Sequence, residues 1–162
     1  MSILEFAMQM EQDGEKLYRG LADTLEDTGL KKIFTMLADE EAEHFKVFKH
    51  LKENTPLGLP ENTILEQSKN IFAAMKESSS FAIDTTTEQK AAYSLALEME
   101  KKSIDFYEEK AKDSQNVEEE KLLKAIAREE RRHYRLIEGI IDFISRPEQW
   151  LEDAEYIQLT EY

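Results

Sequence analysis

Residues 37–45 read LADEEAEHF, and residues 126–134 read IAREERRHY. Each stretch holds a glutamate three residues before a histidine: Glu41 and His44, then Glu130 and His133. On an α-helix, positions three residues apart lie on the same face, about one turn apart. The two side chains of each pair can therefore reach one point in space, and we expect a metal ion at that point.

The composition is that of a helix-rich domain. The chain has 162 residues, of which 41% are hydrophobic and 35% charged, with only 5 Gly and 3 Pro. This length suits one domain, residues 1–162, with a sizeable core. Because there is no cysteine, disulfides, thiolate catalysis and iron–sulfur clusters are excluded. The formal net charge of −14 disfavours nucleic acid and anionic membranes and attracts cations.

Two further observations concern the location of the protein. No stretch reaches the ~18 apolar residues of a membrane span. The first residues, MSILEFAMQMEQDGEK, are acidic and amphipathic and do not resemble a signal peptide. We expect a cytoplasmic protein without a membrane partner.

Apolar residues spaced three and four apart predict long helices. The predicted ranges are about 3–27, 29–53, 87–113 and 116–145, followed by a tail over 146–162. Ser2 with Glu5 and Thr86 with Gln89 have the spacing of capping boxes, and Asn116 is a candidate cap.

The second and third long helices are separated by a link of about thirty residues. Its first part, NTPLGLPEN at 54–62, contains two prolines and a glycine that break a helix. A weaker amphipathic pattern over 61–76 predicts a short helix inside this link.

Polar residues interrupt the four apolar stripes in two matched sets. A shift of 89 residues maps Glu11 onto Glu100 as well as Glu-x-x-His onto Glu-x-x-His, and no gap is needed over about forty residues. This repeat indicates a duplicated helical hairpin. The short turns make each hairpin antiparallel, and the long link is a crossover.

Four glutamates in an apolar core would cost several kcal/mol unless they are paired. Lysine and arginine do not enter the stripes near them. Two divalent cations would balance four carboxylates and two neutral imidazoles, and this ligand chemistry suits iron or manganese. One Glu from each of two helices plus Glu-x-x-His from the other two is the pattern of di-metal carboxylate bundles. The predicted metal ligands are Glu11, Glu41, His44, Glu100, Glu130 and His133.

Over residues 3–145 these motifs resemble the ferritin-like di-iron superfamily, and within it the rubrerythrins. The resemblance implies an all-α, ferritin-like four-helix bundle that binds two iron ions, with manganese or another divalent metal as the alternative. It also implies that Glu41 and Glu130 bridge the two metals and that every other ligand binds one. Tyr18 and Tyr107, which are related by the same shift of 89, would hydrogen-bond ligand glutamates.

Two departures from rubrerythrins bear on the reaction. Without cysteine this chain cannot supply a rubredoxin iron site, so electrons would come from a separate donor or from the iron itself. Where rubrerythrins place an extra glutamate one turn after the third-helix ligand, this chain has Ser103. The remaining set is nearer to the symmetric sites of bacterioferritin-like proteins.

The first functional hypothesis is an oxidoreductase that reduces hydrogen peroxide or dioxygen at a non-haem di-iron centre. The second is a ferroxidase or iron-binding protein that handles Fe²⁺, and a di-iron hydroxylase is a more distant option. A metal-free, acidic helical interaction module is the alternative from another class. We expect a homodimer and a separate electron-donor protein.

The remaining polar residues have simpler interpretations. His50 is predicted to be a surface or helix-end histidine. Glu40, Glu43, Glu129 and the run 118–120 are predicted to lie on solvated faces, although one of them could hydrogen-bond a ligand histidine. Gly14 and Ser103 lie three residues after Glu11 and Glu100, the terminal glutamates, which would each bind one metal. Both small residues are expected to leave room for metal or an oxygen species.

Overall fold

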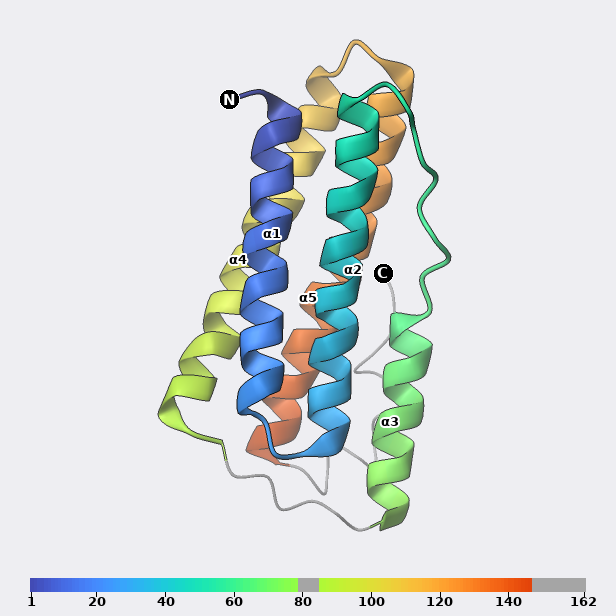
Figure 1. Cartoon of the computed structure of the whole chain (residues 1–162). Helices are drawn as coiled ribbons and strands as arrows, with labels where there is room; N and C mark the ends of the chain where they lie inside the picture. The colour runs from blue at the N-terminus through green and yellow to red at the C-terminus, as the bar shows by residue number, and fades with distance from the viewer. Residues whose placement is uncertain (79–84, 147–162) are drawn as a thin grey trace.

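The structure is a computed structural model that describes residues 1–78 and 85–146. Over these residues it contains helices and no strands, which confirms the predicted all-α class (Figure 1). The helices are α1 (Ile3–Thr24), α2 (Thr28–Lys52), α3 (Ile64–Ser78), α4 (Thr87–Asp113) and α5 (Val117–Ser145).

The helix ends follow local capping chemistry. The Ser2 hydroxyl accepts from the Glu5 amide, and the Glu5 carboxylate accepts from the Ser2 amide, so the predicted capping box is present. Thr86 and Gln89 form the second predicted box. The Asn116 side chain caps α5 by accepting from two amides of its first turn.

Two helix ends differ from the prediction by three residues. The first helix ends at Thr24, three residues early, because Asp27 leaves the helix and caps α2 through the Leu30 amide. The short helix begins at Ile64, because the side-chain oxygen of Asn62 accepts from the Ile64 amide and holds the preceding residues outside the helix.

The long helices form two antiparallel hairpins, α1–α2 and α4–α5, which pack as a four-helix bundle (Figure 1). Helix α1 contacts α4, and α2 contacts α5, so each helix of one hairpin faces its counterpart. The end of α2 and the start of α4 lie at opposite ends of the bundle, which makes the link a crossover. Helix α3 lies in this link and packs against α2.

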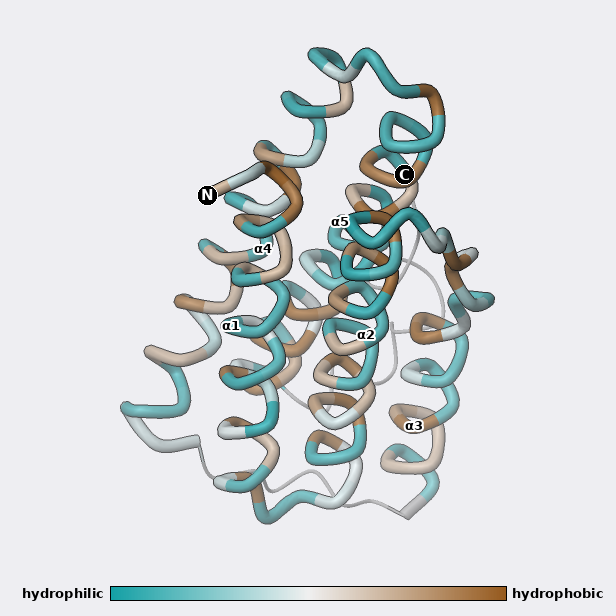
Figure 2. The backbone as a smooth tube through the Cα atoms, turned by 45° about the horizontal axis from the view of Figure 1, so that its top comes forward, coloured by the Kyte–Doolittle hydropathy of each residue, from teal (hydrophilic) through white to brown (hydrophobic). Residues whose placement is uncertain are grey.

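Apolar and polar residues alternate along each long helix (Figure 2), as expected for helices with one buried face. The buried residues form two apolar clusters, one towards each end of the bundle. In all four long helices, the predicted metal ligands fall between the residues of the two clusters. The larger cluster includes Ile64, Phe72 and Met75, because α3 covers it. No helix in the described ranges combines the length and apolar character that crossing a bilayer requires.

Candidate metal centre

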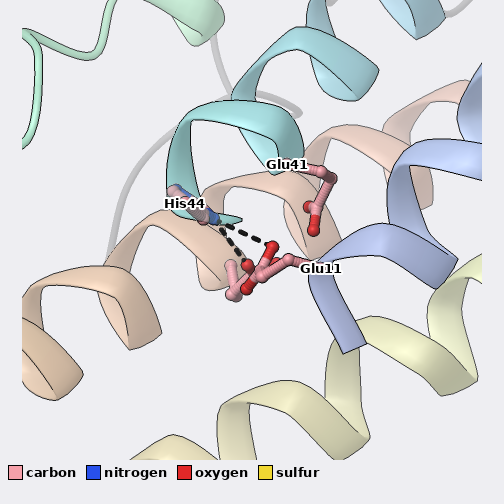
Figure 3. A group of neighbouring side chains, drawn as sticks. Glu11, Glu41 and His44 are labelled. Atoms are coloured by element: carbon pink, nitrogen blue, oxygen red, sulfur yellow. Dashed lines mark hydrogen bonds and ion pairs between the residues drawn. The ribbon is translucent and has the colours of Figure 1, made fainter. Parts of the chain in front are cut away.

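The six predicted ligands meet in the interior of the bundle. All are 3% exposed or less, although each interrupts an apolar stripe. Figure 3 shows Glu11 of α1 converging with Glu41 and His44 of α2. The other three residues reach the same layer from the second hairpin: Glu100 from α4, and Glu130 and His133 from α5.

These side chains form two overlapping groups. Each residue of a group offers a ligand atom within 4.8 Å of those of the others. Glu41 and Glu130 belong to both groups. Glu11 and His44 complete one, and Glu100 and His133 complete the other. The residues expected to bridge two metals are therefore the ones that lie between the two groups.

The duplication in the sequence is also visible in the distances. His44 Nδ1 lies 2.9 Å from Glu130 Oε1 and 3.3 Å from Glu11 Oε2. His133 Nδ1 lies 2.9 Å from Glu41 Oε1 and 3.3 Å from Glu100 Oε1. Each imidazole thus faces the shared glutamate of the opposite hairpin and the terminal glutamate of its own. The two halves of the site are equivalent around an approximate twofold axis.

Two buried tyrosines hold the terminal glutamates. The Tyr107 hydroxyl donates to Glu11 Oε1 at 2.6 Å, and the Tyr18 hydroxyl donates to Glu100 Oε1. Each bond crosses from one hairpin to the other. The tyrosines belong to opposite apolar clusters, so each half of the core positions one terminal carboxylate.

Gly14 makes room for one of the shared glutamates. A Cβ at this position would lie 2.9 Å from Glu41 Oε2 and 3.2 Å from Glu41 Cδ. These distances are below van der Waals contact, so the missing side chain leaves the space that the Glu41 carboxylate needs. Ser103, at the equivalent position of the second hairpin, is buried.

The outer nitrogens of the histidines contact two further glutamates. His44 Nε2 lies 3.0 Å from Glu129 Oε1, and His133 Nε2 lies 2.9 Å from Glu40 Oε1. Glu129 is buried, so the prediction of a solvated face is wrong for it, whereas Glu40 is half-buried. The alternative, that one of these glutamates hydrogen-bonds a ligand histidine, holds for both of them. Their position gave a signal: each directly precedes a Glu-x-x-His motif, and the shift of 89 relates them.

The other predicted surface residues lie outside this network. His50 is at the end of α2, where its Nδ1 lies 3.1 Å from the Thr55 carbonyl oxygen. The Glu43 side chain is 43% exposed and pairs with Lys46. Glu118 is exposed, and Glu119 and Glu120 are partly exposed at the start of α5.

Burial and mutual repulsion shift the pKa values of the carboxyls. Burial, assisted by the charge of a neighbouring glutamate, raises the pKa of Glu11, Glu41 and Glu100. Burial also raises the pKa of Glu130. Hydrogen bonds from Glu100 and the two histidines outweigh burial, so the pKa lies well below the usual range.

The histidines bind protons tightly. Burial alone would lower their pKa values, but the carboxylates outweigh burial and raise both well above 6.5. Glu11 is the main opposing charge for His44, and Glu100 is for His133.

The donor set fits two divalent cations. The ion pairs that the structure shows for the four central glutamates are all with the two histidines. One buried oxygen of each of three glutamates makes no hydrogen bond within the described residues: Glu11 Oε2, Glu100 Oε2 and Glu130 Oε2. Glu11 Oε2 and Glu130 Oε2 have only an imidazole nitrogen at ion-pair distance, 3.3 and 3.4 Å away. Buried carboxylate oxygens without donors are costly unless a cation compensates them. Oxygen and imidazole ligands without sulfur match iron or manganese.

The metal-free protein is expected to lose stability as pH rises. Glu11, Glu41, Glu100 and both histidines bind protons more tightly when folded, so the slope of unfolding free energy against pH is negative. The stability that the protonated carboxyls contribute is lost as pH rises above 4.5. The stability that the protonated histidines contribute is complete below pH 6.5 and is lost as pH rises above that value. We expect a loss on the order of 1–3 kcal/mol between about pH 6 and pH 8.5, measured by urea unfolding with chelator.

A double variant isolates the contribution of the histidines. In His44→Gln with His133→Gln, the pH dependence should be flatter than in the parent chain, while self-repulsion of the acidic surface is little changed. A stability that rises with pH over this range in the parent chain would contradict the assignment.

Comparison with known proteins gives one match. A family model described as Rubrerythrin matches residues 2–141. No curated protein and no solved structure matches the chain. The match covers α1, α2 and α4, α5 up to residue 141, and all six residues of the centre.

Proposed function

The chain belongs to the rubrerythrin family, and we propose that it is a di-iron carboxylate oxidoreductase that reduces hydrogen peroxide or dioxygen. Family membership supports the ferritin-like fold and a metal-binding carboxylate site. The observation that carries the proposal is the pair of buried Glu/His groups that share Glu41 and Glu130. Adjacent cations joined by shared carboxylates can act together on one O–O bond.

The chain would hold one iron ion in each group. Glu41 and Glu130 would contact both ions, and each terminal glutamate and histidine would contact one. Two ferrous ions bound there would supply one electron each; with two protons, these two electrons reduce one hydrogen peroxide to two water molecules, or one dioxygen to hydrogen peroxide. The four central carboxylates would balance the four positive charges of two ferrous ions.

The surrounding residues orient this set and exclude water. The tyrosine hydroxyls fix the terminal glutamates from both ends of the bundle. When His44 Nε2–H donates to Glu129 and His133 Nε2–H donates to Glu40, both Nδ1 atoms keep a lone pair facing the site. The two apolar clusters exclude solvent from either side.

Anaerobic loading with Fe²⁺ tests the proposal. We expect about two iron ions per chain, oxidised by about one equivalent of hydrogen peroxide and more slowly by dioxygen. Absorption spectra before and after each oxidant give the measurement. Binding of less than about 0.2 metal ion per chain would reject it in favour of a metal-free interaction module.

A ferroxidase is the second candidate, with Fe²⁺ as substrate. It is favoured by the net charge of −14 and by an acidic pocket of about 280 Å³ beside Glu40 and Glu129, which Asp39, Glu43 and Glu61 also line. Repeated oxidation of added Fe²⁺ by dioxygen, beyond the two ions that the site holds, would support this activity. If only the two bound ions are oxidised, by either oxidant, the ferroxidase candidate is rejected and the peroxide-reducing proposal stands.

The assembly and partners are further parts of the proposal. We propose a homodimer and a separate electron-donor protein that docks through a basic face onto the acidic surface, in the cytoplasm. Light scattering gives the mass, and the salt dependence of electron transfer tests the charge-based docking.

A further inference from the structure

Asn62, in the link before α3, contacts both halves of the site. Its side-chain nitrogen lies 2.7 Å from Glu40 Oε1 and 3.0 Å from Glu129 Oε1. Its side-chain oxygen accepts from the Ile64 amide at 3.2 Å, which fixes the orientation of the amide group. The two hydrogens of the amide nitrogen can thus serve two carboxylates at once.

The position of Asn62 relative to the repeat is unusual. Glu40 and Glu129 are equivalent residues of the two hairpins, whereas the link that carries Asn62 occurs between the two copies and belongs to neither. A single side chain that bonds equivalent atoms of both copies lies near the approximate twofold axis. Asn62 can therefore act on both halves of the site in the same way.

The hydrogen bonds continue from Asn62 to both imidazoles. Glu40 contacts His133 Nε2, and Glu129 contacts His44 Nε2. The two rings are nearly parallel, with centroids 5.8 Å apart and an interplanar angle of 13°. Asn62 thus closes one connected path from His44 to His133 on the side of the rings that faces away from the central glutamates.

We propose that Asn62 is a positioning residue that holds Glu40 and Glu129 together and thereby fixes both histidines for metal binding, an inference that rests on the proposed di-metal function. Without its two N–H groups, two carboxylates of like charge would lose the donor that they share. Glu40 and Glu129 both line the open acidic pocket, so the two carboxylates would turn apart towards water there. Both imidazoles would then lose the acceptors that set their orientation.

Two substitutions remove the donors and keep the acceptor for α3. Asn62→Asp has the same shape but no N–H group, and it adds a negative charge. Asn62→Ser adds no charge, and its shorter side chain does not reach the glutamates. Gln67→Ala is the matched control, because Gln67 lines the same pocket and its amide bonds Thr63 Oγ1 instead.

Co²⁺ binding to the full chain gives the first measurement. Competition with a chelator measures the affinity. We expect both Co²⁺ ions to bind about 10–100-fold more weakly in either Asn62 variant, with altered visible absorption. In Gln67→Ala, the affinity and the absorption should equal those of the parent chain. Affinities within threefold of the parent chain, or a loss at one site alone, would overturn the proposal.

NMR of the metal-free chain gives the second measurement. The Nε2–H signals of His44 and His133 should both shift and exchange with water about 10-fold faster in the Asn62 variants, because their acceptors are no longer held. A role limited to capping α3 would change neither signal in variants that keep the cap. Unchanged signals, or a change in one histidine alone, would overturn the proposal. If the parent chain binds no Co²⁺, the di-metal function fails, while the NMR result still decides the role of Asn62.

Discussion

Replacing Glu130 with alanine is expected to remove both metal ions, with affinity lowered by more than about 100-fold. Glu130 belongs to both Glu/His groups, so its loss leaves each group with three residues. The substitution also removes the carboxylate at 2.9 Å from His44 Nδ1. Metal content by mass spectrometry and Co²⁺ titration give the measurement.

The contrast with a terminal ligand makes this prediction specific. Glu11→Ala damages one group only, because Glu41, Glu100, Glu130 and His133 remain together, and it should keep about one metal ion. Glu138→Ala, which changes an exposed side chain of α5, should bind two ions as the parent chain does. Equal metal content in Glu130→Ala and Glu11→Ala would contradict the bridging position. Glu130→Gln, which keeps the side-chain volume, separates lost charge from lost packing.

Metal binding is expected to stabilise the fold by several kcal/mol. The folded chain assembles the ligands from four helices, whereas the unfolded chain does not, so binding favours folding by mass action. At a free metal concentration of 1,000 times Kd, each site should add about 4 kcal/mol. Thermal unfolding with Co²⁺ and with chelator measures the effect.

The same experiment with Glu130→Ala is the control. Its melting temperature should be nearly independent of Co²⁺, whereas that of Glu138→Ala should rise with metal as the parent chain does. A parent chain that melts at the same temperature with metal and with chelator would contradict a site that binds metal in the folded state.

The long helices and the identity of the six central residues could be read from the sequence because both signals are short-range or repeated. Ser2 with Glu5 and Thr86 with Gln89 specify helix starts within three residues. The shift of 89 separates Glu11, Glu41, Glu100 and Glu130 from the many other glutamates of the chain. Their roles as ligands remain predictions for the metal measurements.

The residues around the site could be predicted less well from the sequence. The shift of 89 relates Glu40 to Glu129, but only the packed bundle shows that both contact the histidines. Asn62 carried no functional signal, because it lies in the link between the two copies and is not part of the repeat. Its contacts depend on how the crossover passes over the hairpins.

The sequence by itself determined the two hairpins, their duplication and the residues that interrupt their apolar stripes. Helix periodicity and capping act over a few residues, and a repeat needs no knowledge of contacts. The tertiary structure decided which residues meet: Tyr18 bonds Glu100, Tyr107 bonds Glu11, and each outer glutamate contacts the histidine of the opposite hairpin. These bonds cross between hairpins because the two copies pack face to face around a twofold axis, and that arrangement is a property of packing that no local spacing contains.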